Sequence, residues 1–313
     1  MPDAIANRCR PFGFGLLLLI ALSSSLRAQI PAVKADRPVA AIKRVLIISI
    51  DGLRPDLLLR AKTPRMHALL KSGSFTFWAQ TAAEAYTLPC HVSMLTGVSS
   101  KIHGVTWNDY IEESYPESPM LFELAKKTGY STALVSGKMK FITFAKPGAL
   151  DWSWLPSDEP VEDADVAQQA VKLMRAHQPE VLFVHFPGVD NIGHDKDWGS
   201  PEQLRAVETA DNAVGTVLDA LASLNLAGST LLILTADHGG AAKDHGAGDP
   251  RSLCIPWIAN GPGIRQDFDL TRVPELSIHI EDTFATACAF MGIDPGKSVE
   301  GKPVMSILSA GAK

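Results

Sequence analysis

Carboxylate and imidazole side chains that could bind metal ions occur at four points in the sequence. They are Asp51, the pair Asp190 and His194, the pair Asp237 and His238, and His245. Three carboxylates combined with three imidazoles suit Zn²⁺ or Mn²⁺ better than Ca²⁺, which prefers oxygen ligands alone. One ion could take Asp190, His194 and His245. A second could take Asp51, Asp237 and His238, and each would keep the open position of a catalytic site.

Each of these residues also has an ordinary structural interpretation. An Asp-Gly pair after a strand, such as the one at Asp51, commonly forms a turn. Asp190 and His194 are four positions apart, so they could meet on one helical turn or be an unrelated surface pair. Neighbours in a strand point to opposite faces. Asp237 and His238 therefore reach one centre only if the backbone turns, which the two glycines after them permit.

A two-metal site also needs a nucleophile, and Thr87 is the candidate. It stands at the start of an expected helix over 87–96, where free N–H groups and the helix dipole favour an anion. A threonine hydroxyl is a weak nucleophile alone, but a metal ion favours loss of its proton. A threonine before Leu-Pro is also an ordinary N-cap, and that interpretation stays open.

Continuous apolar runs precede these residues and predict the strands that position them. Runs 45–50, 181–186 and 230–235 are rich in β-branched and large apolar residues, which is typical of strands buried on both faces. Sites of open parallel sheets lie beyond the carboxyl ends of the strands. We therefore expect the candidate ligands to meet at one edge of a sheet.

Helical patterns separate the apolar runs. The clearest lies over 202–224, where apolar residues recur at helical spacing along one face. Further helices are expected over 63–72, 87–96, 118–127, 161–176 and 280–291, and further strands over 75–80, 132–135 and 254–258. The alternation implies an α/β fold with a mostly parallel central sheet sandwiched by helices. Without an internal repeat or composition break, residues 43–313 are predicted to form one domain.

Composition limits the classes of protein. The 313 residues are 46% hydrophobic and 20% charged, so the chain can bury a sizeable core. The formal charge of -5 and the lack of a basic block argue against a nucleic-acid-binding surface. The irregular spacing of Cys90, Cys254 and Cys288 gives no disulfide framework, so we expect small buried residues.

Residues 1–28 have the pattern of a signal peptide. Arg8 and Arg10 precede the apolar run 14–22, and Ala28 stands at a plausible cleavage point. A membrane span needs about 20 apolar residues, so this run is short for one. We expect a secreted or periplasmic protein without stable membrane insertion after cleavage; an uncleaved anchor is the alternative. Residues 29–42 are expected to be a linker.

Several motifs then combine in a specific order. They are Ile-Ser-Ile-Asp51-Gly-Leu-Arg-Pro-Asp, Thr87-Leu-Pro-Cys-His-Val-Ser-Met-Leu-Thr-Gly, Lys101-Ile-His103-Gly-Val-Thr-Trp-Asn108, Asp190-x-x-x-His194 and Thr-Ala-Asp237-His238-Gly. In this order the chain resembles the alkaline phosphatase superfamily and, within it, the type I phosphodiesterase/nucleotide pyrophosphatase family. The resemblance runs from about residue 44 to the end.

The resemblance implies a metal-dependent hydrolase of phosphate esters with a small-molecule substrate. By similarity, two divalent ions, expected to be Zn²⁺, would be held by the six ligands above and by Thr87. Thr87 would attack phosphorus and form a covalent phosphothreonine, and Asn108 would bind a phosphoryl oxygen.

The sequence departs from the family pattern in two places. The last metal histidine usually follows a long insertion, whereas His245 follows the Asp-His pair almost at once, as in the related cofactor-independent mutases; His279 is the alternative ligand. The second departure is Lys138 and Lys140 after the strand over 132–135. A similar loop binds substrate in phosphonoacetate hydrolases and some monoesterases, but two solvated surface lysines would look the same.

The little chain between His194 and His245 predicts an open site without an inserted wall. Any cap would come from segments near 107–120 and 141–165, whose aromatic residues either stack on a base or pack a loop. These residues are Trp107, Tyr110, Phe141, Trp152 and Trp154.

The expected function keeps its alternatives. A neutral Asn108 beside two cations leaves room for a diester, whereas the charges of Lys138 and Lys140 would favour a monoester dianion or a phosphonate. A phosphoryl-group transferase using the same phosphothreonine, or an exported binding protein that has lost catalysis, also stays open.

Overall fold

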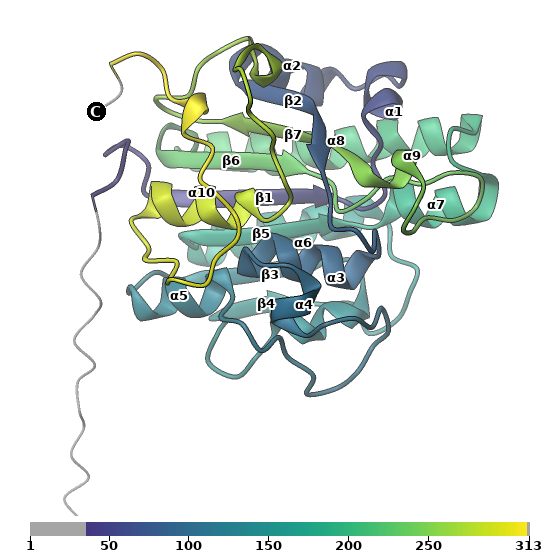
Figure 1. Ribbon diagram of the computed structural model, residues 1–313, viewed down its shortest axis with the longest axis horizontal. Helices are drawn as coiled ribbons and strands as arrows, with labels where there is room; N and C mark the ends of the chain where they lie inside the picture. Colours follow the sequence, from purple (N-terminus) through teal and green to yellow (C-terminus); the bar gives the residue numbers. More distant parts are fainter. Residues whose placement is uncertain (1–35, 312–313) are drawn as a thin grey trace, which may run out of the picture. The chain divides into compact units, whose positions relative to one another are not determined.

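An eight-stranded sheet forms the centre of residues 36–311, which are the residues that this computed structural model describes (Figure 1). In sheet order the strands are β4 (Trp152–Trp154), β3 (Thr132–Ser136), β5 (Val181–Phe186), β1 (Arg44–Ile50), β6 (Thr230–Thr235), β7 (Cys254–Asn260), β2 (Ser74–Gln80) and β8 (Phe268–Asp269). The five strands from β4 to β6 are parallel, β7 runs antiparallel to both neighbours, and β8 is parallel to β2. The mostly parallel sheet predicted from the sequence is confirmed.

Burial explains why the central strands read as continuous apolar runs. Every residue of β3, β5 and β6 is buried, and so are all residues of β1 after Arg44. Helices cover both faces of such strands, so neither face needs polar side chains. Near the edge of the sheet, β2 alternates between buried and partly exposed residues, and Trp78 is exposed.

Two groups of helices cover the sheet. In one group, α1 (Pro55–Arg60), α2 (Pro64–Ser72), α6 (Asp163–His177) and α7 (Gly188–Lys196) each contact the long α8 (Pro201–Ser223). The other group consists of α3 (Thr87–Thr96), α4 (Ser100–His103), α5 (Leu121–Lys127) and α10 (Asp282–Met291). Figure 1 shows this second group in front of the sheet, with the fainter α6 and α8 behind it.

The local signals of the helices agree with their positions. The Ser200 hydroxyl accepts a hydrogen bond from the Gln203 N–H at the start of α8, and Pro201 follows it. α3 ends at Gly97, whose φ of 71° is left-handed, and a Cβ there would collide with Phe284 of α10. The predicted helices over 63–72, 87–96 and 202–224 are confirmed within one or two residues.

The sequence did not predict α7, which carries two of the candidate ligands. Gly188 and Gly193 weaken the helix signal after Pro187. A Cβ on Gly193 would lie 2.7 Å from the Gln203 side chain of α8 and 2.8 Å from Trp198. Close packing on α8 therefore selects glycine there and stabilises the helix in place of intrinsic propensity.

The remaining short elements connect the larger ones. They are α9 (Pro250–Leu253) and the 3-10 turns η1 (Met139–Phe144), η2 (Ala227–Ser229), η3 (Leu270–Arg272) and η4 (Met305–Ile307). The predicted signal peptide lies outside the described residues. Of the predicted linker, residues 36–42 have neither helix nor strand, but Val39 and Ile42 are buried. Among residues 36–311, no helix combines the length and apolar character that crossing a bilayer requires.

Candidate metal centre and active site

The carboxyl ends of three neighbouring strands bring the candidate ligands together. In the middle strand β1, Ser49 is in register with His185 of β5 and with Thr235 of β6. Asp51 and Asp237 each lie two residues beyond this level, and α7 begins directly after β5. The expected meeting point at one sheet edge is therefore where these residues lie.

The turn after β1 requires Gly52. Its φ is 71°, and its N–H donates a hydrogen bond to Asp237 Oδ1 at 3.1 Å. A Cβ at this position would lie 3.0 Å from the Asp190 Cα. A glycine here thus lets the segments that carry Asp51, Asp190 and Asp237 approach one another.

The first cluster consists of Asp190, His194 and His245. Asp190 Oδ1 lies 3.4 Å from His194 Nε2 and 3.7 Å from His245 Nε2. The Nδ1 of His194 lies 2.8 Å from the Lys243 carbonyl oxygen, and the Nδ1 of His245 lies 2.6 Å from that of Ala85. A carbonyl only accepts, so each Nδ1 carries the hydrogen and each Nε2 is left to bind a cation.

The second cluster consists of Asp51, Asp237 and His238. His238 Nε2 lies 3.4 Å from Asp51 Oδ1 and 3.1 Å from Asp237 Oδ2. Its Nδ1 lies 2.9 Å from the Gly239 carbonyl oxygen, so the same tautomer applies. Ligand atoms of Asp51, His238 and Asp190 of the first cluster also lie within 4.8 Å of one another, which makes the two clusters neighbours.

Three carboxylate oxygens in these clusters are buried and accept no hydrogen bond from residues 36–311. They are Asp51 Oδ1, Asp190 Oδ1 and Asp237 Oδ2. A buried carboxylate oxygen without a donor costs free energy unless a cation compensates it. Because each of these oxygens faces an imidazole Nε2, the chemistry of both clusters fits a divalent ion.

The charges in the site are not balanced by the chain alone. The Lys138 ammonium lies 2.7 Å from Asp51 Oδ2 and 2.6 Å from Asp190 Oδ2. Burial alone would lower the pKa of Lys138, but these two carboxylates raise it above its usual value. Burial, together with the charges of Asp51 and Asp190, raises the pKa of Asp237 well above its usual value. The alternative of a solvated surface lysine is wrong for Lys138, which is buried.

Asn108 connects the second predicted lysine to the start of α3. Its Oδ1 accepts hydrogen bonds from Lys140 Nζ at 3.0 Å and from the Leu88 N–H at 2.9 Å. Lys140 also reaches the Asn108 carbonyl oxygen at 3.2 Å. One of the free N–H groups at the helix start is therefore taken by Asn108 in this structure.

Thr87 is the first residue of α3 and is buried. The residue before the helix is Tyr86, and the Thr87 hydroxyl lies 3.3 Å from His238 Nε2 instead of capping α3. The interpretation of Thr87 as an ordinary N-cap is therefore wrong. Its hydroxyl lies directly beside the second cluster.

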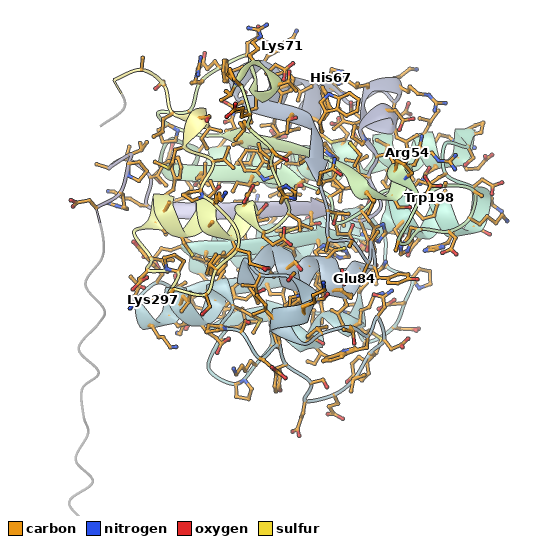
Figure 2. All side chains as sticks on the ribbon, in the orientation of Figure 1. Arg54, His67, Lys71, Glu84, Trp198 and Lys297 are labelled. Atoms are coloured by element: carbon orange, nitrogen blue, oxygen red, sulfur yellow. The ribbon has the colours of Figure 1, made fainter. Side chains whose placement is uncertain are left out.

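Trp198 supports the first cluster and was not identified from the sequence. Its indole N–H donates to the Gly52 carbonyl oxygen at 3.0 Å, and its ring meets His194 and His245 edge-on, with centroids 5.1 and 5.9 Å apart. Figure 2 shows Trp198 at the α7 end of the sheet. Its position four residues after His194 was the feature of the sequence that could have indicated a contact between the two side chains.

Two buried histidines were also missed. His91 lies on α3, four residues after Thr87 and thus on the same helix face, and His185 lies in β5. His91 Nδ1 lies 3.4 Å from Asp237 Oδ2. His185 Nε2 lies 3.0 Å from Asp51 Oδ2. A histidine inside an otherwise apolar strand, as at 185, was the signal that could have found it.

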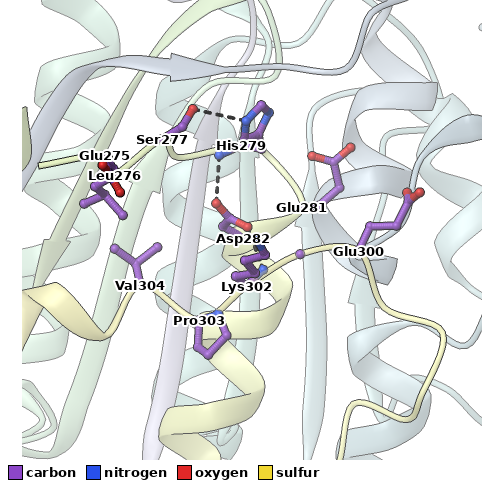
Figure 3. A pocket seen from close by; sticks show the side chains of 11 residues that line it. Glu275, Leu276, Ser277, His279, Glu281, Asp282, Glu300, Lys302, Pro303 and Val304 are labelled. Atoms are coloured by element: carbon purple, nitrogen blue, oxygen red, sulfur yellow. Dashed lines mark hydrogen bonds between the residues drawn. The ribbon is translucent and has the colours of Figure 1, made fainter.

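His279, the alternative last ligand, lies in a separate pocket of about 430 Å³. There its Nε2 contacts the Ser277 hydroxyl at 3.1 Å, and its backbone N–H donates to Asp282 (Figure 3). The residue that lies with Asp190 and His194 is thus His245.

The aromatic residues expected near the site have different environments. Phe141 is fully buried, and Trp152 stacks on His177 with ring centroids 4.2 Å apart. Trp107 and Trp154 pack against the core, whereas Tyr110 is 50% exposed. Of these five residues, only Tyr110 is exposed.

The chain is thus an α/β protein that carries carboxylate and imidazole clusters at the ends of its central strands. The chain belongs to the type I phosphodiesterase/nucleotide pyrophosphatase family, whose model matches residues 45–248.

Comparison with known proteins agrees with this family. The chain is 22% identical to ectonucleotide pyrophosphatase/phosphodiesterase family member 5 of Homo sapiens, over 63% of this chain and 45% of that protein. It is 26% identical to family member 1 of Homo sapiens, over 62% of this chain and 23% of that protein. The chain thus spans less than half the length of these two relatives.

Solved structures share the fold. A murine ectonucleotide pyrophosphatase/phosphodiesterase 5 in complex with AMP superimposes with a TM-score of 0.72 at 16% identity, covering 85% of this chain and 100% of that one. The phosphonate monoester hydrolase of Agrobacterium radiobacter gives a TM-score of 0.66 at 17% identity, covering 85% of this chain and 77% of that one.

Proposed function

We propose that this protein is an exported two-metal hydrolase of phosphate esters, of the phosphodiesterase/nucleotide pyrophosphatase type, with Thr87 as nucleophile. One observation carries the proposal: three buried carboxylate oxygens lack donors, and each faces an imidazole Nε2. A protein fold retains such an arrangement when cations fill it, because the bare carboxylates repel one another.

The first cluster would hold one ion through Asp190, His194 and His245. The second cluster would hold the other, with the Thr87 hydroxyl beside it. Mixed oxygen and imidazole ligands favour Zn²⁺. Bound divalent ions would supply Lewis acidity for the phosphoryl oxygens and lower the pKa of a coordinated hydroxyl.

Thr87 Oγ would form a bond to phosphorus while the leaving alcohol oxygen departs with the electrons of its bond to phosphorus. The product would be a covalent phosphothreonine. The proton that Thr87 loses would end on the leaving alcohol. Water would then attack phosphorus and break the Thr87–phosphorus bond, and a proton of that water would restore the Thr87 hydroxyl. Burial of Thr87 at the start of α3 supports this role, because the helix dipole favours the anion that develops there.

Asn108 and Lys140 would bind the phosphoryl oxygens that the metal ions leave free. Asn108 Oδ1 accepts from Lys140 Nζ at 3.0 Å and from the Leu88 N–H. These two donors therefore point at the same place. A phosphoryl oxygen that replaced Asn108 Oδ1 as acceptor would find both donors in place.

A specific observation also favours a second candidate, a phosphate monoesterase or a phosphonoacetate-type hydrolase. Lys138 and Lys140 both lie at the site rather than in solvent. Two ammonium groups suit the dianion of a monoester better than the single charge of a diester.

Export is part of the proposal. The predicted signal over 1–28 supports it, and so do the names of the human relatives, which describe ectoenzymes. The small cap segments near 107–120 and 141–165 remain a proposal as well, with Tyr110 as the exposed aromatic side chain that could contact a leaving group.

The test combines metal analysis with hydrolysis by the full chain. Zinc-loaded protein should contain two ions per chain and cleave aryl monoester, aryl diester, nucleotide or phosphonate substrates, and the ranking selects between the two candidates. Thr87→Ala should retain zinc but lose kcat by about 1000-fold or more, equal to about 4 kcal/mol of barrier. Near-normal turnover of that variant would refute the nucleophile.

Thr96→Ala is the matched control. Thr96 is a buried threonine of the same helix whose hydroxyl donates to the Val92 carbonyl oxygen, away from both clusters. This variant should keep both zinc ions and nearly full activity. Adding an acceptor alcohol separates hydrolysis from transfer, because a transferase would release an alkyl phosphate.

A further inference from the structure

Two buried histidines outside the proposed ligand set lie behind the second cluster. His91 of α3 and His185 of β5 are both 0% exposed. His185 contacts Asp51 Oδ2, whereas His238 faces the other oxygen of Asp51. His91 lies beside Asp237 Oδ2, the oxygen that also faces His238. Neither histidine belongs to the six predicted ligands.

The hydrogen bonds of His185 form one consistent chain of donors and acceptors. Its Nε2 lies 3.0 Å from Asp51 Oδ2, and a carboxylate accepts only, so Nε2 carries the hydrogen. In the neutral imidazole, Nδ1 then accepts from the Ser136 hydroxyl at 3.1 Å. The Ser136 oxygen in turn accepts the Lys138 backbone N–H at 3.1 Å. His185 is therefore held by hydrogen-bond partners at both nitrogens.

His91 is fixed in the opposite tautomer. Its Nδ1 donates to the Thr87 carbonyl oxygen at 2.7 Å, and the same nitrogen lies 3.4 Å from Asp237 Oδ2. Its Nε2 accepts from the Ser49 hydroxyl at 2.8 Å. Since Ser49 lies in β1, His91 connects α3 and the nucleophile candidate to the strand that ends at Asp51.

One aromatic ring prevents both imidazoles from turning. The ring centroid of Phe141 lies 4.2 Å from that of His185 and 4.8 Å from that of His91, and the two imidazole centroids are 5.0 Å apart. The ring centroid of Phe183 lies 5.9 Å from that of His91. Close packing of this kind holds a side chain in one rotamer.

The first cluster is supported by different groups. Its histidines are oriented by the carbonyl oxygens of Lys243 and Ala85, which lie in loops, and they pack against the Trp198 ring. Lys138 Nζ donates to Asp190 Oδ2 at 2.6 Å. The side chain of His194 is 41% exposed, whereas those of Asp51, Asp237 and His238 are 0% exposed. Among the described residues, buried histidines outside the ligand set contact only the carboxylates of the cluster beside Thr87.

We propose that His185 and His91 are positioning residues for the metal ion of the second cluster, and that they set the affinity of that site. His185 aims Asp51 through a hydrogen bond, and His91 holds Asp237 in place by packing beside its Oδ2 at 3.4 Å. The inference rests on the proposed two-metal function. His185 holds Asp51 Oδ2, which leaves Oδ1 directed at His238 Nε2. Hydrogen bonds that orient metal ligands typically contribute about 10–100-fold to metal affinity.

The experiment measures Zn²⁺ and Co²⁺ affinity by competition with a chromophoric chelator, without substrate. Wild-type protein should show two binding steps. His185→Phe and His91→Leu should each weaken one step by about 10–100-fold and leave the other within about threefold. The d–d spectrum of Co²⁺ should change for the weakened site only.

Conservative variants separate positioning from packing. His185→Gln retains a donor that can reach Asp51, and His91→Asn retains one near the Thr87 carbonyl oxygen, so both should recover most of the lost affinity. Ser136→Ala removes the bond that orients His185 and should weaken the same step by a few-fold, which keeps the test valid if His185→Phe does not fold.

His103→Phe is the control, because His103 is a buried histidine that contacts Ser93 and Val105 but neither cluster. It should leave both affinities unchanged. The inference is overturned if the His185 and His91 variants bind both ions like wild type. It is also overturned if both binding steps weaken equally and the melting temperature of the metal-free protein falls as well. Wild-type protein that binds no metal would instead refute the proposed function itself.

Discussion

The two clusters are made of the same ligand types but are built differently. Asp190 and His194 lie on one short helix, and His245 comes from a loop next to them. Asp51 and Asp237 instead follow neighbouring strands, and buried histidines from two further elements support them. The cluster beside the proposed nucleophile Thr87 is thus built on the sheet, whereas its neighbour is built on a short helix and a loop.

The largest effect is expected from Asp51→Asn, which removes a charge from the rigid second cluster. The variant should lose turnover by about 1000-fold, or about 4 kcal/mol of barrier, because Asp51 lies between Lys138 and His238. Steady-state kinetics on an aryl ester would measure it. Asp56→Asn, which affects an exposed carboxylate paired with Arg54, is the control and should be nearly silent. Equal activities of the two variants would contradict the importance of this cluster.

Asp163 tests the scaffold of the first cluster. It is buried at the start of α6 and accepts the Gly188 N–H at the start of α7, and burial raises its pKa from 3.8 to about 7. The folded state therefore holds the proton more tightly than the unfolded state. Its stabilising contribution is complete below about pH 4 and is lost as the pH rises through about 7, a change of about 2 to 4 kcal/mol.

Thermal unfolding of metal-free Asp163→Asn should lack this part of the pH dependence between pH 4 and 7. Asp165→Asn, at an exposed position of the same helix, should follow the wild-type curve. An Asp163→Asn curve parallel to wild type would show that Asp163 ionises normally.

His194→Ala tests whether the first cluster binds its ion independently of the second cluster. Because it removes a proposed ligand, it should weaken one of the two zinc-binding steps by more than the roughly 10–100-fold that loss of an orienting partner costs, and leave the second cluster occupied. Isothermal titration with Zn²⁺ would resolve the steps. Exposed His177 offers a control, since His177→Ala removes an imidazole far from the ligands. Loss of both steps in His194→Ala would mean that the clusters are not independent.

The smallest effect is expected from Trp198→Phe, which keeps an aromatic ring beside His194 but removes the hydrogen bond to the Gly52 carbonyl oxygen. One such bond contributes about 1 kcal/mol to stability. Denaturant unfolding would measure this loss, and Trp78→Phe, at a residue that is 69% exposed, should cost less. A variant as stable as wild type would remove Trp198 as a link between the clusters.

Much of the framework was predictable because its signals are local. The strands over 181–186 and 230–235 match the structure, since residues buried on both faces must be apolar throughout. The helix over 202–224 follows from its apolar stripe. α7 was missed because its glycines are selected by contacts with α8 and Trp198, which no local pattern contains.

The site was predictable in its ligands but not in its surroundings. Strand-end positions grouped Asp51, Asp190 and Asp237 correctly, because parallel strands end at one edge. The burial of Lys138 between two carboxylates could not be predicted, since a lysine after a strand is usually solvated. His91 and His185 were overlooked for the converse reason, because buried histidines within apolar segments resemble core residues.

The sequence by itself determined that the chain forms a mostly parallel sheet, that polar residues follow three of its strands, and which side chains could hold a cation. Only the tertiary structure decided which nitrogen of each imidazole is free, which carboxylate oxygens lack a donor and which lysine is buried. Those properties depend on distances of a few ångströms between segments far apart in the chain. Hydrophobic periodicity and intrinsic propensity carry no information about such distances, whereas the packing of the folded chain sets them.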